Sequence, residues 1–293
     1  MQIPVTNPVE ATADEQDWDL EIKPHEQILN LHLKDVWNYR DLLLLLVRRD
    51  FVSFYKQTIF GPLWFFIQPV FTTILFTIVF KKMGNFKTED IPAPLFYLCG
   101  TVAWNYFADC ITKTSTVFRD NAHIFGKVYF PRLIMPLSIV ISNLVRFGVQ
   151  FLLFLVLFGW YVYKGHELQP NSYLLLFPVI IICMALLGLG AGLIITAMTT
   201  KYRDLAFLVA FGIQLLMYLS PVIYPLSSAP GSYKTLVMLN PMSGLIETFR
   251  YGFLDKGHFY AGAFVYSMVV SVIVFVAGLI IFNKVEKNFV DTI

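Results

Sequence analysis

The feature that most constrains this chain is a long uncharged stretch that directly follows a basic segment. Arg48, Arg49 and Lys56 precede the stretch, and no charged residue occurs again until Lys81. Cations followed by Trp64 and several phenylalanines are typical of the point where a chain enters a bilayer. About 20 apolar residues cross the hydrocarbon core as a helix. The stretch therefore predicts a transmembrane helix that starts from the cytosol.

Further apolar segments make the chain a polytopic membrane protein. Its residues are 57% hydrophobic and 14% charged, whereas about 25% are charged in soluble domains. The three cysteines are scattered and the N-terminus is acidic, so neither a disulfide framework nor a signal peptide is indicated. The expected fold is all-α, with six transmembrane helices at about 59–80, 95–117, 133–162, 173–199, 205–224 and 260–282.

The residues around the spans divide into three parts. Residues 1–30 are polar and acidic, which predicts a disordered cytosolic tail. Residues 31–58 show a moderate helical separation of polar and apolar side chains, with an apolar run too short to cross a bilayer. We expect an amphipathic helix lying on the cytosolic leaflet, with an ordinary packed cytosolic helix as the alternative. The six-span domain would occupy 59–283, followed by a cytosolic tail at 284–293.

The positions of Lys and Arg predict the orientation. With both termini in the cytosol, the inner segments carry roughly twice as many of these residues as the outer ones, with Arg250 counted as outer. The segment at about 225–255, before the last span, holds two apolar runs that are too short to cross and are separated by Asn240-Pro241. It predicts a re-entrant helical hairpin, which is tolerated where it packs in protein or lines a cavity.

The chain lacks the motifs of an ATPase or a metalloenzyme. No GxxxxGK[ST] pattern occurs, so a phosphate-binding loop for ATP is not predicted. The five histidines lack the paired spacing of a metal site. No GxSxG motif and no acidic pair lies within a span. We therefore expect no catalytic residue, no metal and no cofactor bound by this chain.

Polar residues inside the predicted spans are the first candidates for function. Ser138, Ser142, Arg146 and Gln150 recur every four positions and form one stripe of the third span. An intramembrane Arg costs about 2.5–3.5 kcal/mol on insertion scales, so it should face protein or water. Two compatible interpretations stay open: Arg146 pairs with Asp109 and holds helices together, or the stripe lines a translocation path. The candidate path residues are Phe66, Gln68, Asp109, Ser142, Asn143, Arg146, Gln150, Gln214 and Tyr218.

Three further features of the sequence suggest contacts. A stripe of small residues permits close helix contact, within one subunit or, less favoured, between two copies; it consists of Ala185, Gly188, Gly192 and Thr196. Some of the abundant aromatic rings could stack on sugars along a path. The connections at 119–132 and 201–204 carry charge beside aromatic groups, which predicts docking of a soluble partner. A plain turn is the alternative for 201–204.

Taken together, these motifs resemble the membrane subunit of type-2 ABC exporters for polysaccharides, of the O-antigen and teichoic-acid kind. The resemblance covers residues 48–250, in order, and excludes the acidic tail. The matching residues are Arg49-Asp50, Tyr55-Lys-Gln-Thr-Ile-Phe-Gly-Pro-Leu-Trp64, Gln68-Pro69, Lys201-Tyr-Arg-Asp204, Ser220-Pro-Val-Ile-Tyr-Pro225, Leu239-Asn-Pro241 and Glu247-Thr-Phe-Arg250.

The resemblance implies a homodimeric permease of the cytoplasmic (inner) membrane. It would export a lipid-linked polysaccharide, such as an O-antigen-like glycan on undecaprenyl diphosphate. Two copies of a separate nucleotide-binding ATPase subunit would hold ATP and Mg, and membrane lipids would surround the spans. No nucleic-acid partner is expected. The residues implied in ATPase coupling are Arg119, Asp120, His123, Phe125, Tyr129, Lys201, Tyr202, Arg203 and Asp204. Those implied in binding the carrier diphosphate are Arg48, Arg49 and Lys56.

Alternatives from other classes stay open at this point. The chain could export teichoic acid, a drug or a lipid, could be a membrane-embedded glycosyl- or acyltransferase, or could be a structural scaffold for the envelope. The missing catalytic cluster weighs against the transferase. The exposed charged connections weigh against the scaffold.

Overall fold

The computed structural model describes residues 33–56, 59–125, 130–200, 202, 204–229 and 231–289. All regular structure within these residues is helical, in agreement with the predicted fold class. The predicted tail at 1–30 and the end of the chain after Phe289 lie outside the described residues.

Two helices, α1 (Leu33–Asn38) and α2 (Arg40–Lys56), form the segment expected to be amphipathic. Leu46 is buried, and α2 packs along α7 (Ile134–Tyr163). Trp37, Leu44 and Leu45 are exposed on the other side. A helix with one packed face and exposed apolar side chains fits an interfacial position, which stays a prediction.

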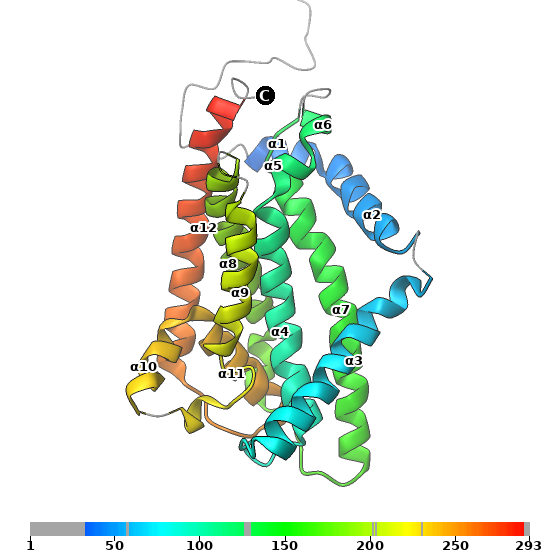
Figure 1. Ribbon diagram of the computed structural model, residues 1–293, viewed down its shortest axis with the longest axis vertical. Coiled ribbons are helices and arrows are strands. Elements are labelled where there is room, and N and C mark those ends of the chain that lie inside the picture. The colour runs from blue at the N-terminus through cyan, green and yellow to red at the C-terminus, as the bar shows by residue number, and fades with distance from the viewer. Residues whose placement is uncertain are drawn as a thin grey trace, which may run out of the picture.

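The bundle is built from helices that follow the predicted spans closely. Several helical stretches run along the length of the bundle (Figure 1). They are α3 with its π-helical continuation η2, α4, α7, α8, α9 and α12. Their bounds are Trp64–Phe76 for α3, Thr77–Met83 for η2, Ala93–Thr114 for α4, Phe177–Thr199 for α8, Leu205–Tyr218 for α9 and Ala261–Phe289 for α12.

Within the described residues, four helical stretches are long and apolar enough to cross a membrane. They are Trp64–Met83, Ile134–Tyr163, Ser172–Thr199 and Ala261–Val285. Helix α9 is apolar but shorter. Helix α4 carries Asn105, Asp109 and Lys113 yet is the centre of the core, where its polar groups meet protein. The count of six spans therefore stays a prediction.

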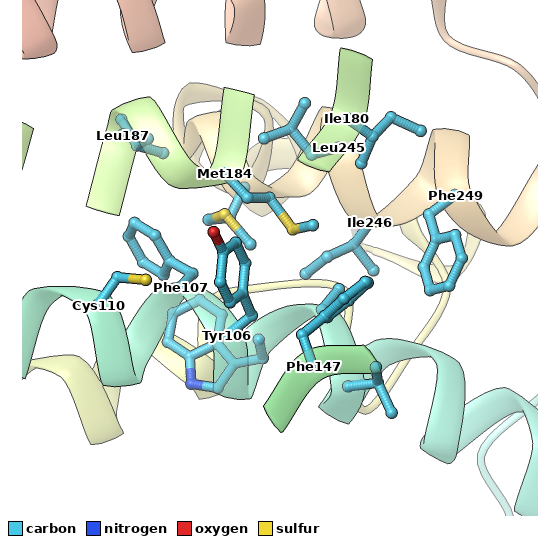
Figure 2. Packing of buried hydrophobic residues seen from close by; sticks show 14 of the residues in the cluster. Tyr106, Phe107, Cys110, Phe147, Ile180, Met184, Leu187, Leu245, Ile246 and Phe249 are labelled. Carbon is cyan, nitrogen blue, oxygen red and sulfur yellow. The ribbon is translucent and has the colours of Figure 1, made fainter. Parts of the chain in front are cut away.

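Helix α4 packs against α3, α7, α8 and α11 (Pro241–Leu254). Figure 2 shows Tyr106 and Phe107 of α4 between Phe147 of α7 and Met184 and Leu187 of α8. In a membrane, close packing and interhelical polar contacts take the place of water exclusion in holding such helices together. The position of α4 is therefore fixed on several sides at once.

The small-residue stripe of α8 faces inside the subunit. A Cβ atom on Gly188 would lie 2.7 Å from Cys110 Cβ, and one on Gly192 would lie 2.6 Å from Thr114 Cβ. Both glycines therefore face α4. Packing within one subunit, the favoured interpretation of this stripe, is confirmed.

Short elements occupy the two ends of the bundle. The helices α5 (Val117–Asp120) and α6 (Ala122–Phe125) lie at the end where α1 begins and α12 finishes, here called the α5 end (Figure 1). Helix α10 (Gly231–Leu239) and α11 lie toward the opposite end, the α11 end (Figure 1). The remaining turns are η1 (Gly61–Leu63), η3 (Ser172–Leu176) and η4 (Leu226–Ser228).

The two short apolar runs before the last span form α10 and α11, as expected for two half-helices. Asn240 separates them, and its side-chain oxygen caps α11 by accepting from the Met242 N–H at 3.0 Å. Most of α11 is buried. Entry of this hairpin into a membrane stays a prediction. The fifth predicted span ends early, at Tyr218, because Ser220 to Pro225 form a turn.

Candidate functional site

A pocket of about 330 Å³ lies where α2, α3, α4 and α7 meet. It combines charged, hydroxyl, amide and aromatic groups, which is unusual between helices of such apolar sequence. Its lining residues are Asp50, Phe51, Ser53, Phe65, Lys113, Ile139, Ser142, Asn143 and Arg146. Because Lys113 is the second-last residue of α4, the pocket lies toward the α5 end.

Arg146 is paired as expected from its position in a span. Its Nη1 donates to Asp109 Oδ2 at 3.1 Å, joining α7 to α4. The guanidinium also lies over the ring of Phe65, 5.2 Å from the ring centroid. Pairing between Arg146 and Asp109 is therefore confirmed, and the same arginine borders the pocket. The polar stripe therefore both links α7 to α4 and lines a pocket, so the two interpretations of the stripe are compatible.

Lys113 is a pocket residue that is absent from the candidate path residues predicted above. Its Nζ donates to Asn143 Oδ1 at 2.8 Å, and Asn143 Nδ2 approaches Cys110 Sγ at 3.8 Å. Within the described residues, the Lys113 ammonium makes this one hydrogen bond and no ion pair. A signal existed: Lys113 follows Asp109 by one helical turn and therefore shares its face of α4.

Helix α2 contributes to the pocket through residues other than those expected. Arg49 Nε and Nη2 both donate to Asp50 Oδ1, at 3.0 and 2.8 Å, while Arg48 and Lys56 are exposed. Asp50 and Ser53 line the pocket instead. The three cations assigned to a diphosphate therefore lie near the pocket's α2 wall but are absent from its lining.

The remaining path candidates do not gather in one place. Gln150 is only 8% exposed, among the neighbouring helices. Gln68 and Gln214 are exposed, Tyr218 is half-exposed and Phe66 is partly buried. The structure thus brings Asp109, Ser142, Asn143 and Arg146 together, whereas Gln68, Gln214 and Tyr218 lie on the outer surface of the subunit.

Many aromatic side chains pack on one another inside the subunit. Phe151 of α7 stacks on Phe177 of α8 with 4.7 Å between ring centroids, and Phe154 meets Phe249 of α11 at 5.6 Å. Phe253 of α11 joins both groups. Such ring pairs hold α11 against α7 and α8. These rings are therefore part of the core and are unavailable for stacking on a sugar.

The Glu247…Arg250 motif forms a buried ion pair. Arg250 is 0% exposed, and its Nη1 donates to Glu247 Oε1 at 3.0 Å. Its Nη2 donates to the Pro221 carbonyl at 2.7 Å, and the Leu226 N–H donates to Glu247 Oε1 at 3.0 Å. The pair therefore ties α11 to the Ser220 to Pro225 turn. Arg250 was counted with the outer charges; its burial shows that it is not a solvated loop charge, and the side of the membrane on which it lies stays a prediction.

The residues assigned to ATPase coupling lie at the α5 end or outside the described residues. Arg119 Nε donates to Asp120 Oδ1 at 3.0 Å in an exposed pair. Tyr202 is half-exposed and Asp204 is exposed. His123 and Phe125 belong to α6. Tyr129, Lys201 and Arg203 lie outside the described residues.

Helices long enough to span a membrane, packed around a charged pocket, define an integral membrane protein. The chain belongs to the ABC-2 type transporter family, whose model matches residues 41–254. Membership makes it a multi-pass membrane protein and implies a partner ATPase subunit. The matched range includes both the pocket and the buried Glu247–Arg250 pair.

Three similar proteins align over two thirds to nine tenths of this chain. The O-antigen export system permease protein RfbA of Myxococcus xanthus is 28% identical over 264 residues, which are 89% of this chain and 98% of that protein. The protein of the same description from Klebsiella pneumoniae is 27% identical over 252 residues, 86% and 94% of the two chains. The polysialic acid transport protein KpsM of Escherichia coli is 22% identical over 206 residues, 67% and 76%.

Proposed function

We propose that this chain is the transmembrane subunit of an ABC exporter that moves a lipid-linked polysaccharide, such as an O-antigen-like glycan on undecaprenyl diphosphate, out of the cytoplasm. The observation that carries the proposal is the family match together with relatives named for O-antigen export that align over nearly their full length. A drug or free lipid as substrate has no comparable support among these relatives. The permease itself has no catalytic role, and a separate ATPase subunit hydrolyses ATP.

The proposed assembly contains two copies of this chain and two ATPase subunits in the inner membrane. The exposed apolar side chains of α3 and α9, with Gln68, Gln214 and Tyr218 among them, fit a surface covered by a second copy and by the glycan path. The connections at 119–132 and 201–204 would meet the ATPase. Both belong at the cytosolic face if the two termini are cytosolic.

The pocket offers a place for the charged end of the substrate. Lys113 and Arg146 can donate to phosphate oxygens, while Phe51, Phe65 and Ile139 provide an apolar wall beside them. This location modifies the assignment of Arg48, Arg49 and Lys56, which would attract the diphosphate to the α2 surface. Asp50 and Asp109 limit the net positive charge, so a bound anion could leave again.

Loss of the chain tests the proposed function directly. A host strain without this gene should retain the glycan on its carrier lipid inside the cell and lose it from the surface. The gene itself should restore surface glycan, and it should fail to do so when the partner ATPase is inactive. Unchanged surface glycan in the strain without the gene would exclude polysaccharide export as its role.

The Lys113→Gln substitution tests the pocket. We expect export of lipid-linked glycan to fall about tenfold, because a charge-assisted hydrogen bond to phosphate contributes about 1.5–3 kcal/mol. Lys164→Gln, at the opposite end of α7, is the matched control and should export at the parental rate. Export is measured as surface glycan per amount of permease in the membrane. A parental rate for Lys113→Gln would remove the pocket from the substrate path.

The orientation is tested by cysteine labelling at Asn85, in the loop between η2 and α4. After Cys99, Cys110 and Cys183 are replaced, an impermeant thiol reagent should label an Asn85→Cys variant in intact cells. The expectation rests on the excess of Lys and Arg in the proposed inner segments. Labelling that requires opened membranes would reverse the proposed orientation.

A further inference from the structure

Helix α4 ends inside the protein, where its last carbonyls need donors. The carbonyls of a final helical turn have no partner within the helix. Thr114 is the last residue of α4 and Ser115 follows it, and both are almost completely buried. A buried carbonyl without a hydrogen bond is costly. The donors must therefore come from a neighbouring element.

The hydroxyl groups of the last turn of α8 supply them. Thr196 Oγ1 donates to the Thr114 carbonyl at 2.5 Å, and Thr199 Oγ1 donates to the Ser115 carbonyl. Each hydroxyl also lies near a carbonyl of its own helix, Gly192 at 2.8 Å and Thr196 at 3.2 Å, but the cross-helix oxygen is nearer in both cases. Because a hydroxyl has one proton, the nearer acceptor is favoured. Gly192 permits this approach by leaving room for the Thr114 side chain.

These hydrogen bonds lie at the bases of both connections assigned to the ATPase. Ser115 lies two residues before α5, and Thr199 lies two residues before the 201–204 connection, with Thr114 and Thr196 in the last turns of α4 and α8. The first connection is fixed further by Phe118 of α5, which stacks on Phe282 of α12 at 5.1 Å. The two connections are far apart in sequence but are joined within a few ångströms at their bases.

We propose that Thr196 and Thr199 are positioning residues that join the two connections into one mechanical unit, so that α4 and α8 move together when the ATPase moves either connection. The inference rests on the proposed function only for the identity of the moving partner. Without the hydroxyl groups, the end of α4 could shift relative to α8, and ATP hydrolysis would then drive less transport.

The transport test uses the permease assembled with its ATPase in proteoliposomes. The Thr196→Val/Thr199→Val double variant keeps the shape of both side chains and removes both donors. We expect glycan exported per ATP hydrolysed to fall at least about fivefold, the factor that corresponds to one hydrogen bond of typical net strength. Thr199→Ser, which keeps the hydroxyl donor, should stay within about twofold of the parent.

Two matched controls replace a threonine by valine where the hydroxyl group donates to a carbonyl four residues earlier, in contrast to the cross-helix hydrogen bonds of Thr196 and Thr199. Thr112 Oγ1 donates to the Ala108 carbonyl in α4, and Oγ1 of Thr200, the residue that follows α8, donates back to the Thr196 carbonyl, each at 2.8 Å. Thr112→Val and Thr200→Val should keep the parental ratio of export to hydrolysis. A parental ratio in the double variant, or an equal loss in Thr199→Ser, would overturn the proposal.

A distance measurement tests the unit without any polysaccharide. Spin labels at Asn121→Cys and Met198→Cys, in a chain free of other cysteines and diluted with unlabelled chain, report the distance between the end of α5 and the last turn of α8. The distance should be unchanged by ATP in the parent and should shift or broaden with ATP in the double variant. An ATP-dependent distance in the parent would contradict the rigid unit, whatever substrate the transporter carries.

Discussion

The Arg250→Met substitution should deplete the folded protein, lowering the free energy of unfolding by about 3–5 kcal/mol. This is the usual range when one partner of a buried ion pair is removed and the other is left uncompensated. Glu247 is 4% exposed, and within the described residues the Arg250 guanidinium is its one ion-pair partner. The Pro221 carbonyl would also lose its donor. Thermal unfolding of the detergent-purified protein measures the change.

Two controls for Arg250→Met separate the effect of burying an unpaired charge from the effect of losing an ion pair. Arg119→Met breaks an exposed pair with Asp120 and should cost less than about 1 kcal/mol. The Glu247→Leu/Arg250→Met double variant removes both charges and should recover part of the loss. The Leu226 N–H and the Pro221 carbonyl would still lack their partners, so recovery should be incomplete. Equal stability of Arg250→Met and Arg119→Met would contradict the proposed anchoring of α11.

The Gly190→Ala substitution should separate α8 from α12. An added Cβ would lie 2.5 Å from Phe275 Cα and 2.6 Å from Phe275 N, both backbone atoms that cannot move aside alone. Overpacking of this kind costs about 1–3 kcal/mol, and the backbone contact places this site at the upper end. Loss of stability in thermal unfolding, with a lower level of protein in the membrane, is the expected result.

The matched control for Gly190 is Gly148→Ala in α7. Within the described residues, nothing lies within 4 Å of the Cβ position at Gly148. Alanine is favoured over glycine in a helix by up to about 1 kcal/mol, so this variant should be as stable as the parent or slightly more stable. If both variants behave alike, close contact between α8 and α12 does not contribute to stability.

Several features of the protein could be predicted because they depend on local sequence. Apolar stretches of bilayer length give helices whose starts agree with the structure within a few residues, as at Ile134 and Ala261. Pro221, Pro225 and Asn240-Pro241 disfavour one continuous helix through this segment, so the separate helices α10 and α11 were also foreseeable. Pairing of Arg146 was predictable because a charge within a span needs a partner.

The candidate site could be predicted only in part. Ser142, Asn143 and Arg146 share one face of one helix, which periodicity reveals. Lys113 and Asp50 reach the same pocket from α4 and α2, and their membership depends on how three helices are rotated against one another. That rotation is set by contacts between side chains that are distant in sequence, so no short stretch of the sequence determines it.

The sequence by itself determined the membrane class, the positions of the helices and the need for a partner to Arg146, because hydrophobic length and charge act locally. The tertiary structure decided which groups are neighbours. It buried Arg250 against Glu247, used the phenylalanines of α7 and α11 for packing, and placed the hydroxyls of α8 on the last carbonyls of α4. Each of these outcomes depends on contacts between residues at least three positions and mostly tens of positions apart, which close packing selects and local patterns do not encode.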